Sequence, residues 1–446
     1  MRRIKSWLPC INDDEFQHLR GTNIKRKAGL IAWENMPIVI LALIQGIPLD
    51  GNIASRELLF AEQIFERTQA SSTSLGFESS VIPSLILGGL YLFAVLMLIR
   101  SYRSLGVYLL RRYWPLVMQV LLMGIGMVWA EYAGKVALNV AHNVGVIAIS
   151  LLTAIHFRHE PRRMLSVLGL ALGINIIFHL LVVLLFPDIG IANDGRWAGL
   201  FSNSNSFGAV AYCAVWANAA AVASTRNLLR LSHVVILCIA AIALIGSGST
   251  TSILSTIVAL GILFSLKGSS RRNLLTLSSS AVLLSFAIVI YELFASQGIL
   301  ELIGRTSDLT GRTYIWAEGL NAFLTKPLIG WGFDDNAYVN QVTGMVHPSY
   351  HNGYLDLAVR GGAVSLVLFV AIMIIGIRAI LRTQISSRPT ISSTFLSFIL
   401  SVLLYNFSEG SFFAPRTYMW AMLLTVLFLA VMSSMKFRNP ASKITS

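Results

Sequence analysis

Long apolar stretches alternate with short polar or basic segments along most of the chain. A helix needs about 20 mostly apolar residues to cross the hydrocarbon core of a bilayer. By this criterion we predict an all-α polytopic membrane protein with about twelve transmembrane helices. The predicted spans are 30–48, 81–99, 114–133, 136–156, 164–186, 199–224, 232–248, 250–266, 274–295, 352–377, 391–409 and 417–435.

One polar segment, residues 297–350, interrupts this pattern between the ninth and tenth spans. It is rich in Arg, Trp, Gly and His, and long loops of this kind often carry binding or catalytic residues. We predict that it is a catalytic loop containing short helices. The predicted organisation is a tail (1–28), spans one to nine (29–295), the loop (296–351), spans ten to twelve (352–435) and a second tail (436–446).

Composition supports the membrane assignment. The 446 residues are 55% hydrophobic and only 12% charged, whereas soluble domains have about 25% charged residues. The net charge of +13 suggests either nucleic-acid binding or basic residues on cytoplasmic loops. The positive-inside rule favours the second interpretation, so no nucleic-acid partner is expected. Cys10, Cys213 and Cys238 show neither disulfide nor zinc spacing.

The distribution of basic residues predicts the orientation of the chain. If the N-terminus is cytoplasmic, most of the 34 lysines and arginines fall on the inner segments. Both termini are then cytoplasmic and the 297–350 loop lies outside. In a bacterium this predicts a protein of the inner membrane whose active site faces the periplasm.

Cations are scarce on the predicted outer side, which draws attention to Arg196. It stands beside Trp197 where the chain re-enters the membrane, and interfacial anchors of this kind are common at helix ends. The polar run 202–206 (Ser-Asn-Ser-Asn-Ser) follows and includes Asn205. Such side chains are costly against lipid and should face protein or water. Anchoring and ligand binding both stay open for Arg196.

Two further segments carry groups suited to an anion. Residues 246–252 (Gly-Ser-Gly-Ser-Thr-Thr-Ser) form either a small-residue turn with helix N-caps or a helix N-terminus that presents Ser249 and Thr251 to an anion. Arg312 lies in a Gly-Arg-Thr turn shortly before Trp316. It is either a solvated loop arginine or a phosphate ligand, because guanidinium groups suit bidentate phosphate contact.

His351 lies where the polar loop meets the tenth span, next to Asn352 and shortly before Asp356. Histidine is well suited to proton transfer near neutral pH, and a capping or interfacial histidine is the alternative. His347 and His351 are spaced i, i+4, but the intervening Pro348 and the absence of a Glu between them argue against a metal site. We therefore expect no metal and no cofactor.

Arg360 falls one or two turns into the tenth span, where an arginine needs a partner such as Asp356 or Glu409, or an anionic ligand. Arginines, a helix N-terminus and a histidine are thus predicted to converge at the outer leaflet. This suits a substrate with a lipid tail and an anionic phosphate head. The alternative from another class is a transporter or flippase, which would show midplane ionisable residues, broken helices and a two-fold repeat. The sequence shows none of these clearly.

The loop motifs resemble the signature region of the O-antigen ligase and polysaccharide polymerase superfamily. The matching pieces are 309–316 (Leu-Thr-Gly-Arg-Thr-Tyr-Ile-Trp), 326–333 (Lys-Pro-Leu-Ile-Gly-Trp-Gly-Phe) and 351–356 (His-Asn-Gly-Tyr-Leu-Asp) followed by Gly361-Gly362. Upstream, 199–208 resembles the family's Asn-containing re-entry segment. Downstream, 406–411 resembles its Glu-Ser element, and the likeness covers residues 190–430.

This resemblance implies a GT-C-type membrane glycosyltransferase that needs no metal and no nucleotide sugar. The donor would be a glycan on undecaprenyl diphosphate, and the acceptor a second glycan or lipid A–core. Arg196 and Arg312 would hold the diphosphate, and His351 would be the general base. The candidate substrate-binding residues are Asn205, Ser249, Thr251, Trp316, His347, Asn352, Asp356, Arg360 and Arg416.

Residues 247–251 resemble the Ser-x-Ser-x-Thr form of the exopolysaccharide-polymerase branch more than the Ser-Arg pair of many ligases. We therefore favour an inverting polymerase of repeat units. An O-antigen ligase that acts on lipid A–core or protein is the alternative. The lipid bilayer, a chain-length regulator and a flippase are the other expected partners.

Overall fold

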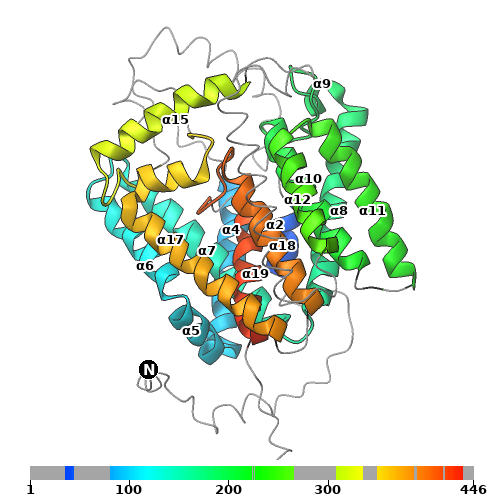
Figure 1. Cartoon of the computed structure of the whole chain (residues 1–446), viewed down its shortest axis with the longest axis horizontal. Helices are drawn as coiled ribbons and strands as arrows, with labels where there is room; N and C mark the ends of the chain where they lie inside the picture. Colours follow the sequence, from blue (N-terminus) through cyan, green and yellow to red (C-terminus); the bar gives the residue numbers. More distant parts are fainter. Residues whose placement is uncertain are drawn as a thin grey trace, which may run out of the picture. The chain divides into compact units, whose positions relative to one another are not determined.

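The computed structural model describes residues 36–44, 81–223, 225, 227–265, 308–334, 349–385, 389–414 and 417–434. All of them belong to one compact unit, Glu34–Ser446. Within these ranges the secondary structure is helical, apart from one isolated bridge between Ile191 and Trp197. The prediction of an all-α protein is therefore confirmed for this part of the chain (Figure 1).

The described residues form a series of helices along the chain. They are α2 (Met36–Leu43), α4 (Val81–Ser101), α5 (Arg103–Arg112), α6 (Trp114–Ile125), the 3-10 helix η3 (Gly126–Val128), α7 (Ala133–His156), α8 (Pro161–Leu185), α9 (Pro187–Gly190), α10 (Ser204–Val222), α11 (Asn227–Ser247), α12 (Thr250–Ser265), α15 (Asp308–Thr325), α17 (Gly353–Ile385), α18 (Pro389–Tyr405) and α19 (Tyr418–Ser434).

Helices lie at the positions of all predicted spans except 274–295, which falls outside the described residues. Four of them, α7, α8, α11 and α17, are long and apolar enough to cross a membrane. A fifth is obtained if the bent pair α4–α5 counts as one span, and four further apolar helices are shorter. These helices are those of a membrane protein, whereas the count of twelve spans and the GT-C fold stay predictions.

Local signals explain several helix starts. Pro161 opens α8, where its fixed φ suits the first turn and its missing N–H leaves no donor unsatisfied. The side chain of Asn203 caps α10 by accepting a hydrogen bond from Ser206 N at 2.8 Å. The polar run that the sequence placed inside a span thus begins the helix, which starts at Ser204 rather than at residue 199.

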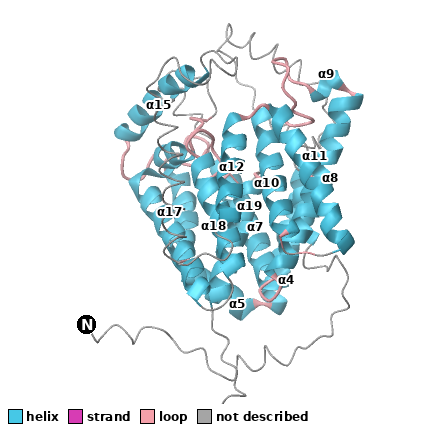
Figure 2. Ribbon diagram, turned by 45° about the vertical axis from the view of Figure 1, so that its right-hand side comes forward, coloured by secondary structure: helices cyan, strands magenta, loops and turns pink. Residues whose placement is uncertain are grey.

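The basic segment after α4 is itself a helix. α5 bends by 106° from α4 and buries Leu105 and Leu109, while Arg111 and Arg112 are exposed in its last turn. α5 lies at one end of the helical unit and α15 and α9 at the other (Figures 1 and 2). The sequence predicted only a cytoplasmic loop here, and the structure replaces it with an amphipathic helix.

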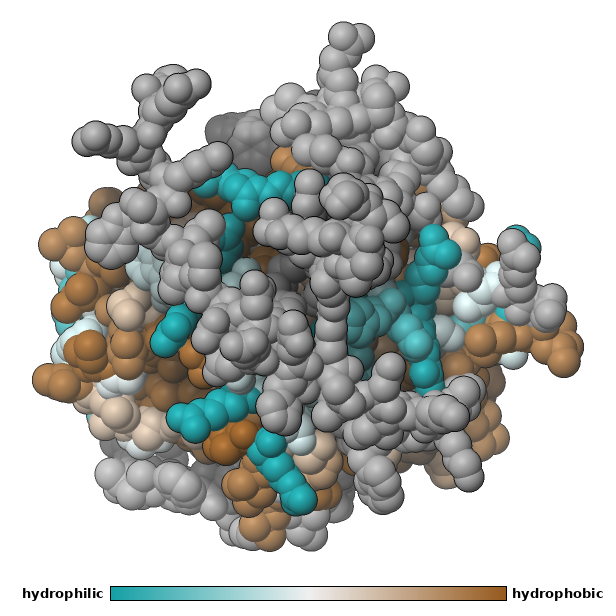
Figure 3. Space-filling model, turned by 90° about the horizontal axis from the view of Figure 1, so that it is seen from below, coloured by the Kyte–Doolittle hydropathy of each residue, from teal (hydrophilic) through white to brown (hydrophobic). Residues whose placement is uncertain are grey.

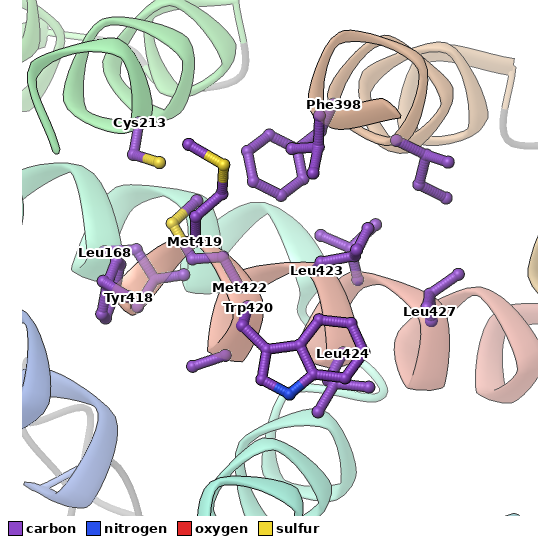
Figure 4. Close-up of a cluster of buried hydrophobic side chains, with 14 of the residues drawn as sticks. Leu168, Cys213, Phe398, Tyr418, Met419, Trp420, Met422, Leu423, Leu424 and Leu427 are labelled. Carbon is purple, nitrogen blue, oxygen red and sulfur yellow. The ribbon is translucent and has the colours of Figure 1, made fainter. Parts of the chain in front are cut away.

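α19 forms the centre of the unit. Every residue from Tyr418 to Met432 is buried, as expected for a helix that is apolar on all sides. Figure 4 shows its side chains against Leu168 of α8, Cys213 of α10 and Phe398 of α18. Some buried polar groups are paired with α19: Tyr113 Oη donates to the carbonyl of Leu427 at 2.7 Å. Such bonds satisfy groups that lipid could not.

Hydrophobic side chains also cover much of the outer surface. Viewed from the α5 end, they line the circumference of the described part, and hydrophilic side chains lie nearer the middle of this face (Figure 3). Leu184, Ile245 and Val367 are each about two-thirds exposed or more. Exposed aliphatic residues on the helix flanks suit contact with lipid tails.

α17 is broken at Gly362, whose backbone (φ 66°, ψ −167°) is not helical. The 326–332 segment lies against the break and satisfies the freed backbone groups. The hydrogen bonds are Trp331 N to Val359 O (2.9 Å), Gly332 N to Arg360 O (2.9 Å), Ala363 N to Pro327 O (2.7 Å) and Val364 N to Leu328 O (3.2 Å). Non-helical backbone at membrane depth is tolerated only where protein or water supplies such partners.

The sequence analysis found no clear broken helix, and in this respect it was wrong. The break permits a very close backbone approach, because a Cβ at Gly330 would lie 2.5 Å from the carbonyl oxygen of Arg360. A Cβ at Gly362 would collide with the backbone of Leu328. The 326–332 segment therefore attaches α15 to the first half of α17, just beyond His351.

Candidate functional site

The turn that carries His351 is held in place by the carboxylate of Asp356. His351 has a positive φ of 48°, which is uncommon for a residue with a side chain. Its N–H donates to Ser349 Oγ at 3.1 Å, and Ser349 Oγ donates to Asp356 Oδ2 at 2.9 Å. Tyr350 N–H donates to Asp356 Oδ1 at 3.0 Å. Asp356, one turn into α17 and 7% exposed, thus fixes the backbone on which His351 stands.

The start of α17 is joined to the turn between α18 and α19. Asn352 Oδ1 accepts from the N–H groups of Tyr354 and Leu355 and so caps α17. Its amide Nδ2 donates to the carbonyl of Phe407 at 3.0 Å. Gly353 N–H donates to the carbonyls of Asn406 (2.9 Å) and Glu409 (3.0 Å). The 406–411 turn is therefore positioned directly beside His351.

Glu409 lies between His351 and α10. Its Oε2 lies 3.4 Å from Nδ1 of His351, and its Oε1 accepts from Asn205 Nδ2 at 2.8 Å. The Glu409 side chain is 11% exposed, whereas that of His351 is 38% exposed. The carboxylate is thus almost enclosed and holds one ring nitrogen of a histidine that remains open to a substrate.

Arg196 reaches the same group from the loop before α10. This loop turns tightly at Gly195 (φ 78°), with Ala192 N–H donating to the carbonyl of Arg196 at 2.8 Å. The guanidinium of Arg196 pairs with Asp194 Oδ2 at 2.5 Å, and its Nη1 donates to Asn205 Oδ1 at 3.3 Å. Arg196 and His351 are thereby linked through Asn205 and Glu409.

The charge of Arg196 also acts on Asp194. Partial burial by itself raises the pKa of the Asp194 carboxyl, but hydrogen bonds from the side chain and N–H of Arg196, together with its charge, outweigh burial and lower that pKa. Asp194 is therefore ionised at neutral pH and orients the guanidinium. The side chain of Arg196 is 26% exposed.

These side chains form one connected polar series: Asp194, Arg196, Asn205, Glu409 and His351. Chemically, such a series offers an arginine–aspartate ion pair at one end and a histidine–carboxylate pair at the other. A carboxylate that accepts Nδ1–H would leave Nε2 as the proton acceptor. The structure brings the candidates Arg196, Asn205, Asn352, Asp356 and His351 together in one region.

Ser249 and Thr251 occupy the adjoining start of α12. Ser249 Oγ accepts weakly from Ser252 N at 3.4 Å and donates to Ser252 Oγ at 2.9 Å, and it is 1% exposed. This is the helix-cap arrangement that the sequence offered as one alternative. Thr251 Oγ1 lies 2.7 Å from Ser408 Oγ, so it contacts the turn that carries Glu409. Substrate contact by either residue stays a prediction.

α15 covers the histidine turn from the loop side. Trp316 Nε1 donates to the carbonyl of Tyr350 at 3.0 Å, and Gly319 lies against Tyr350 and Leu355. Trp316 is thus placed next to the residue that precedes His351. This hydrogen bond helps to position the turn. Substrate binding by Trp316 stays a prediction.

Other predicted site residues are only partly described. The backbone of Arg312 belongs to α15, but its side chain lies outside the described residues, as do His347 and Arg416. Arg360 is half-buried and its carbonyl accepts from Gly332 N–H. A partner for its guanidinium and the convergence of Arg312 on the site stay predictions.

Glu409 belongs to the candidate site by its contacts with His351 and Asn205, and it was not predicted as a site residue from the sequence. It was considered only as a partner for Arg360 and as part of the Glu-Ser element. The useful signal was its location, because a lone acid between two apolar helices at the predicted outer surface needs a partner.

Comparison with known proteins shows that part of this chain is similar to a known family. Residues 234–370 match the family model described as O-antigen ligase, a segment that contains Arg312 and His351. The "Exopolysaccharide production protein ExoQ" of Rhizobium meliloti is 26% identical over 155 residues, covering 30% of this chain and 35% of that protein. The "O-antigen ligase" of Pseudomonas aeruginosa is 30% identical over 173 residues, covering 39% of this chain and 40% of that protein.

The matched segment spans little more than a third of the length of these two relatives. The segment that matches the family model contains the motifs around Arg312 and His351. Over residues 234–370 the chain is thus similar to the O-antigen ligase family, and its apolar helices are those of a membrane protein.

Proposed function

We propose that this protein is a membrane glycosyltransferase that moves a glycan from undecaprenyl diphosphate to an acceptor hydroxyl at the periplasmic face of the inner membrane. The acceptor in this proposal is the end sugar of another lipid-linked repeat unit. The observation that carries the proposal is the contact of His351, which lies within the matched family segment, with Glu409, 3.4 Å away. It supplies an oriented proton acceptor that is open to substrate.

The proposed reaction begins with proton transfer to His351. In the tautomer that donates Nδ1–H to Glu409, which lies 3.4 Å away, Nε2 of His351 carries the lone pair. Nε2 removes the proton of the acceptor hydroxyl as its oxygen bonds to the anomeric carbon. The proton then resides on His351, and the carboxylate of Glu409 stabilises the imidazolium. General-base assistance of this kind contributes about 10²–10⁴ in rate.

The bond that breaks joins the anomeric carbon to the diphosphate oxygen. The lipid diphosphate leaves with the bonding electrons, and attack from the opposite face inverts the anomeric configuration. Arg196, and Arg312 from α15, stabilise the charge that develops on the diphosphate. Asn205 couples the two halves of the reaction, because its amide group bonds both Arg196 and Glu409.

The choice between polymerase and ligase depends on the acceptor. The Ser-x-Ser-x-Thr form of residues 247–251 and the similarity to an exopolysaccharide production protein favour the polymerase. The similarity to an O-antigen ligase favours the second candidate, in which lipid A–core or a protein receives the glycan. Both candidates use the same donor, the same general base and the same predicted orientation.

The two candidates are separated by the surface glycans of a deletion strain. Loss of a polymerase leaves products that carry a single repeat unit. Loss of a ligase leaves long chains attached to the lipid carrier. Surface glycans identical in length and attachment to those of the parent strain would argue against both candidates, and complementation with the wild-type chain is the control.

A further inference from the structure

A second pocket lies at the α15 end of the unit, beside the break in α17. It has a volume of about 330 Å³ and is lined by Trp129, Lys326, Pro327, Leu328, Ile329 and Gly330. This volume is at the lower end of the range of about 300–1,000 Å³ that is typical of ligand sites. None of the residues assigned to glycan transfer lines it.

The walls of this pocket are held in place by backbone contacts. The 326–330 side is attached to α17 by the hydrogen bonds of Pro327 and Leu328 across the break. The Trp129 side follows η3, where Gly126 approaches both the Trp129 ring and Gly332. The pocket is thus formed by two segments that are distant in sequence, Trp129 after η3 and residues 326–330 after α15.

Two of the residues that line the pocket, Trp129 and Lys326, carry hydrogen-bond donors of the kind that bind a phosphate. Trp129 Nε1 is buried and has no hydrogen-bond partner among the described residues. The ammonium of Lys326 lies 4.0 Å from the centroid of the Trp331 ring, and no described carboxylate lies within ion-pair distance of it. An indole N–H and an ammonium together form a donor pair for an anionic oxygen.

The rim of the pocket is apolar and faces outward. Val128 is 85% exposed, Leu328 69% and Ile329 45%. On α15, Leu320 and Leu324 are also exposed and lie one turn apart. Aliphatic side chains exposed in this way beside a cation are typical of the bilayer interface, where a ligand has a charged head and a hydrocarbon chain.

We propose that this pocket binds an anionic phospholipid of the surrounding bilayer, with its phosphate at Lys326 and Trp129 and its acyl chain along Leu328 and Ile329. Lys326 is the one charged residue among the described residues that line the pocket, so an anionic headgroup is favoured over a zwitterionic one. This described lining contains no carboxylate that could pair with the choline of a zwitterionic lipid. Through the hydrogen bonds across the break, the bound lipid stabilises the junction of α15 with α17.

Native mass spectrometry of the full chain in detergent tests the proposal, with dioleoyl phosphatidylglycerol and dioleoyl phosphatidylcholine as probes. We expect phosphatidylglycerol to bind about tenfold more tightly, as one charge-assisted contact allows. Lys326→Gln should remove this preference, and Lys326→Arg should keep it. Trp129→Phe, which retains the ring but not the N–H, should weaken the binding of both lipids.

Lys135→Gln is the matched control. Lys135 is an exposed lysine whose ammonium lies 4.7 Å from the ring centroid of Tyr132, at the start of α7 and outside the pocket. Its variant should bind both lipids as the wild type does. Equal binding of the two lipids by the wild type, an unchanged preference in Lys326→Gln, or an equal loss in Lys135→Gln would overturn the proposal.

Competition with a polyprenyl phosphate tests whether the pocket binds a bilayer phospholipid or the carrier lipid. If polyprenyl phosphate displaces phosphatidylglycerol at lower concentration and this depends on Lys326, the pocket belongs to the carrier and the phospholipid assignment is overturned. The measurement needs no glycan transfer, so its outcome is independent of the proposed function. Thermal unfolding of each variant confirms that it is folded.

Discussion

The carboxylate of Glu409 lies 3.4 Å from Nδ1 of His351, although 58 residues separate them in the chain. The contact exists because Gly353 N–H bonds the carbonyls of both Asn406 and Glu409, which brings the 406–411 turn to the start of α17. A Cβ at Gly353 would collide with the Asn406 side chain. The histidine–carboxylate pair is therefore a product of one close backbone approach.

The first prediction concerns this pair. Glu409→Gln keeps an acceptor for Asn205 but removes the charge that stabilises protonated His351. We expect kcat for glycan transfer to fall about 10²-fold, a large part of what general-base catalysis contributes. The measurement is steady-state transfer from a synthetic lipid-diphosphate glycan. Glu131→Gln, at an exposed glutamate before α7, is the control and should behave as wild type; equal rates in the two variants would contradict the role of Glu409.

The second prediction concerns the close approach at the break in α17. Gly330 has φ 68°, and an added Cβ would lie 2.5 Å from the Arg360 carbonyl oxygen. Gly330→Ala should lower the free energy of unfolding by about 1–3 kcal/mol. Thermal unfolding in detergent measures this. In α6, Gly124 has no atom within 4 Å of an added Cβ, so Gly124→Ala should be neutral or stabilising, and an equal loss in both variants would refute the argument.

The third prediction is a pH dependence at Asp194. Arg196 lowers the pKa of the folded Asp194 below its ordinary value of 3.8. The stabilisation is therefore complete above pH 3.8 and is lost as the pH falls through the folded pKa. Because the carboxylate is 48% exposed, we expect an effect of about 1 kcal/mol or less. The Tm difference between wild type and Asp194→Asn should shrink as the pH is lowered from 6 towards 3; a constant difference would be inconsistent with this pairing.

The fourth prediction concerns metal ions. The proposed reaction uses His351 and arginines rather than a metal to activate the acceptor and to stabilise the diphosphate. Transfer by the purified protein should therefore proceed at an unchanged rate after dialysis against a chelator. A loss of activity that Mg²⁺ or Mn²⁺ restores would show that a divalent ion takes part in holding the diphosphate.

Much of the helical organisation could be predicted from the sequence. Apolar length determines where helices can cross a bilayer, so α7, α8 and α11 lie close to the predicted spans. The break at Gly362 could not be predicted in the same way, since hydropathy is unaffected by it. Consecutive glycines, Gly361 and Gly362, were the available signal. The hydrogen bonds between the 326–332 segment and the break join residues that are distant in sequence. They therefore produce no periodic pattern of hydrophobic residues from which they could be predicted.

The candidate site was predictable as a set of residues but not as a geometry. Chemistry and motif likeness identified Arg196, Asn205 and His351, which the structure brings into one polar series. Asp356 holds the turn before His351 by accepting a hydrogen bond from Tyr350 N–H. This contact goes with the positive φ of His351, which cannot be predicted from the spacing of residues in the sequence. The role of Glu409 required knowledge of how the 406–411 turn packs on α17.

The central claim is that His351 acts as the general base for transfer from a lipid diphosphate. It is tested most directly by assaying purified, reconstituted His351→Gln with a synthetic undecaprenyl-diphosphate repeat unit under single-turnover conditions. We expect donor binding to be retained and the rate of the glycosidic bond-forming step to fall by about 10²–10⁴-fold. Transfer at the wild-type rate by a correctly folded His351→Gln would contradict the claim.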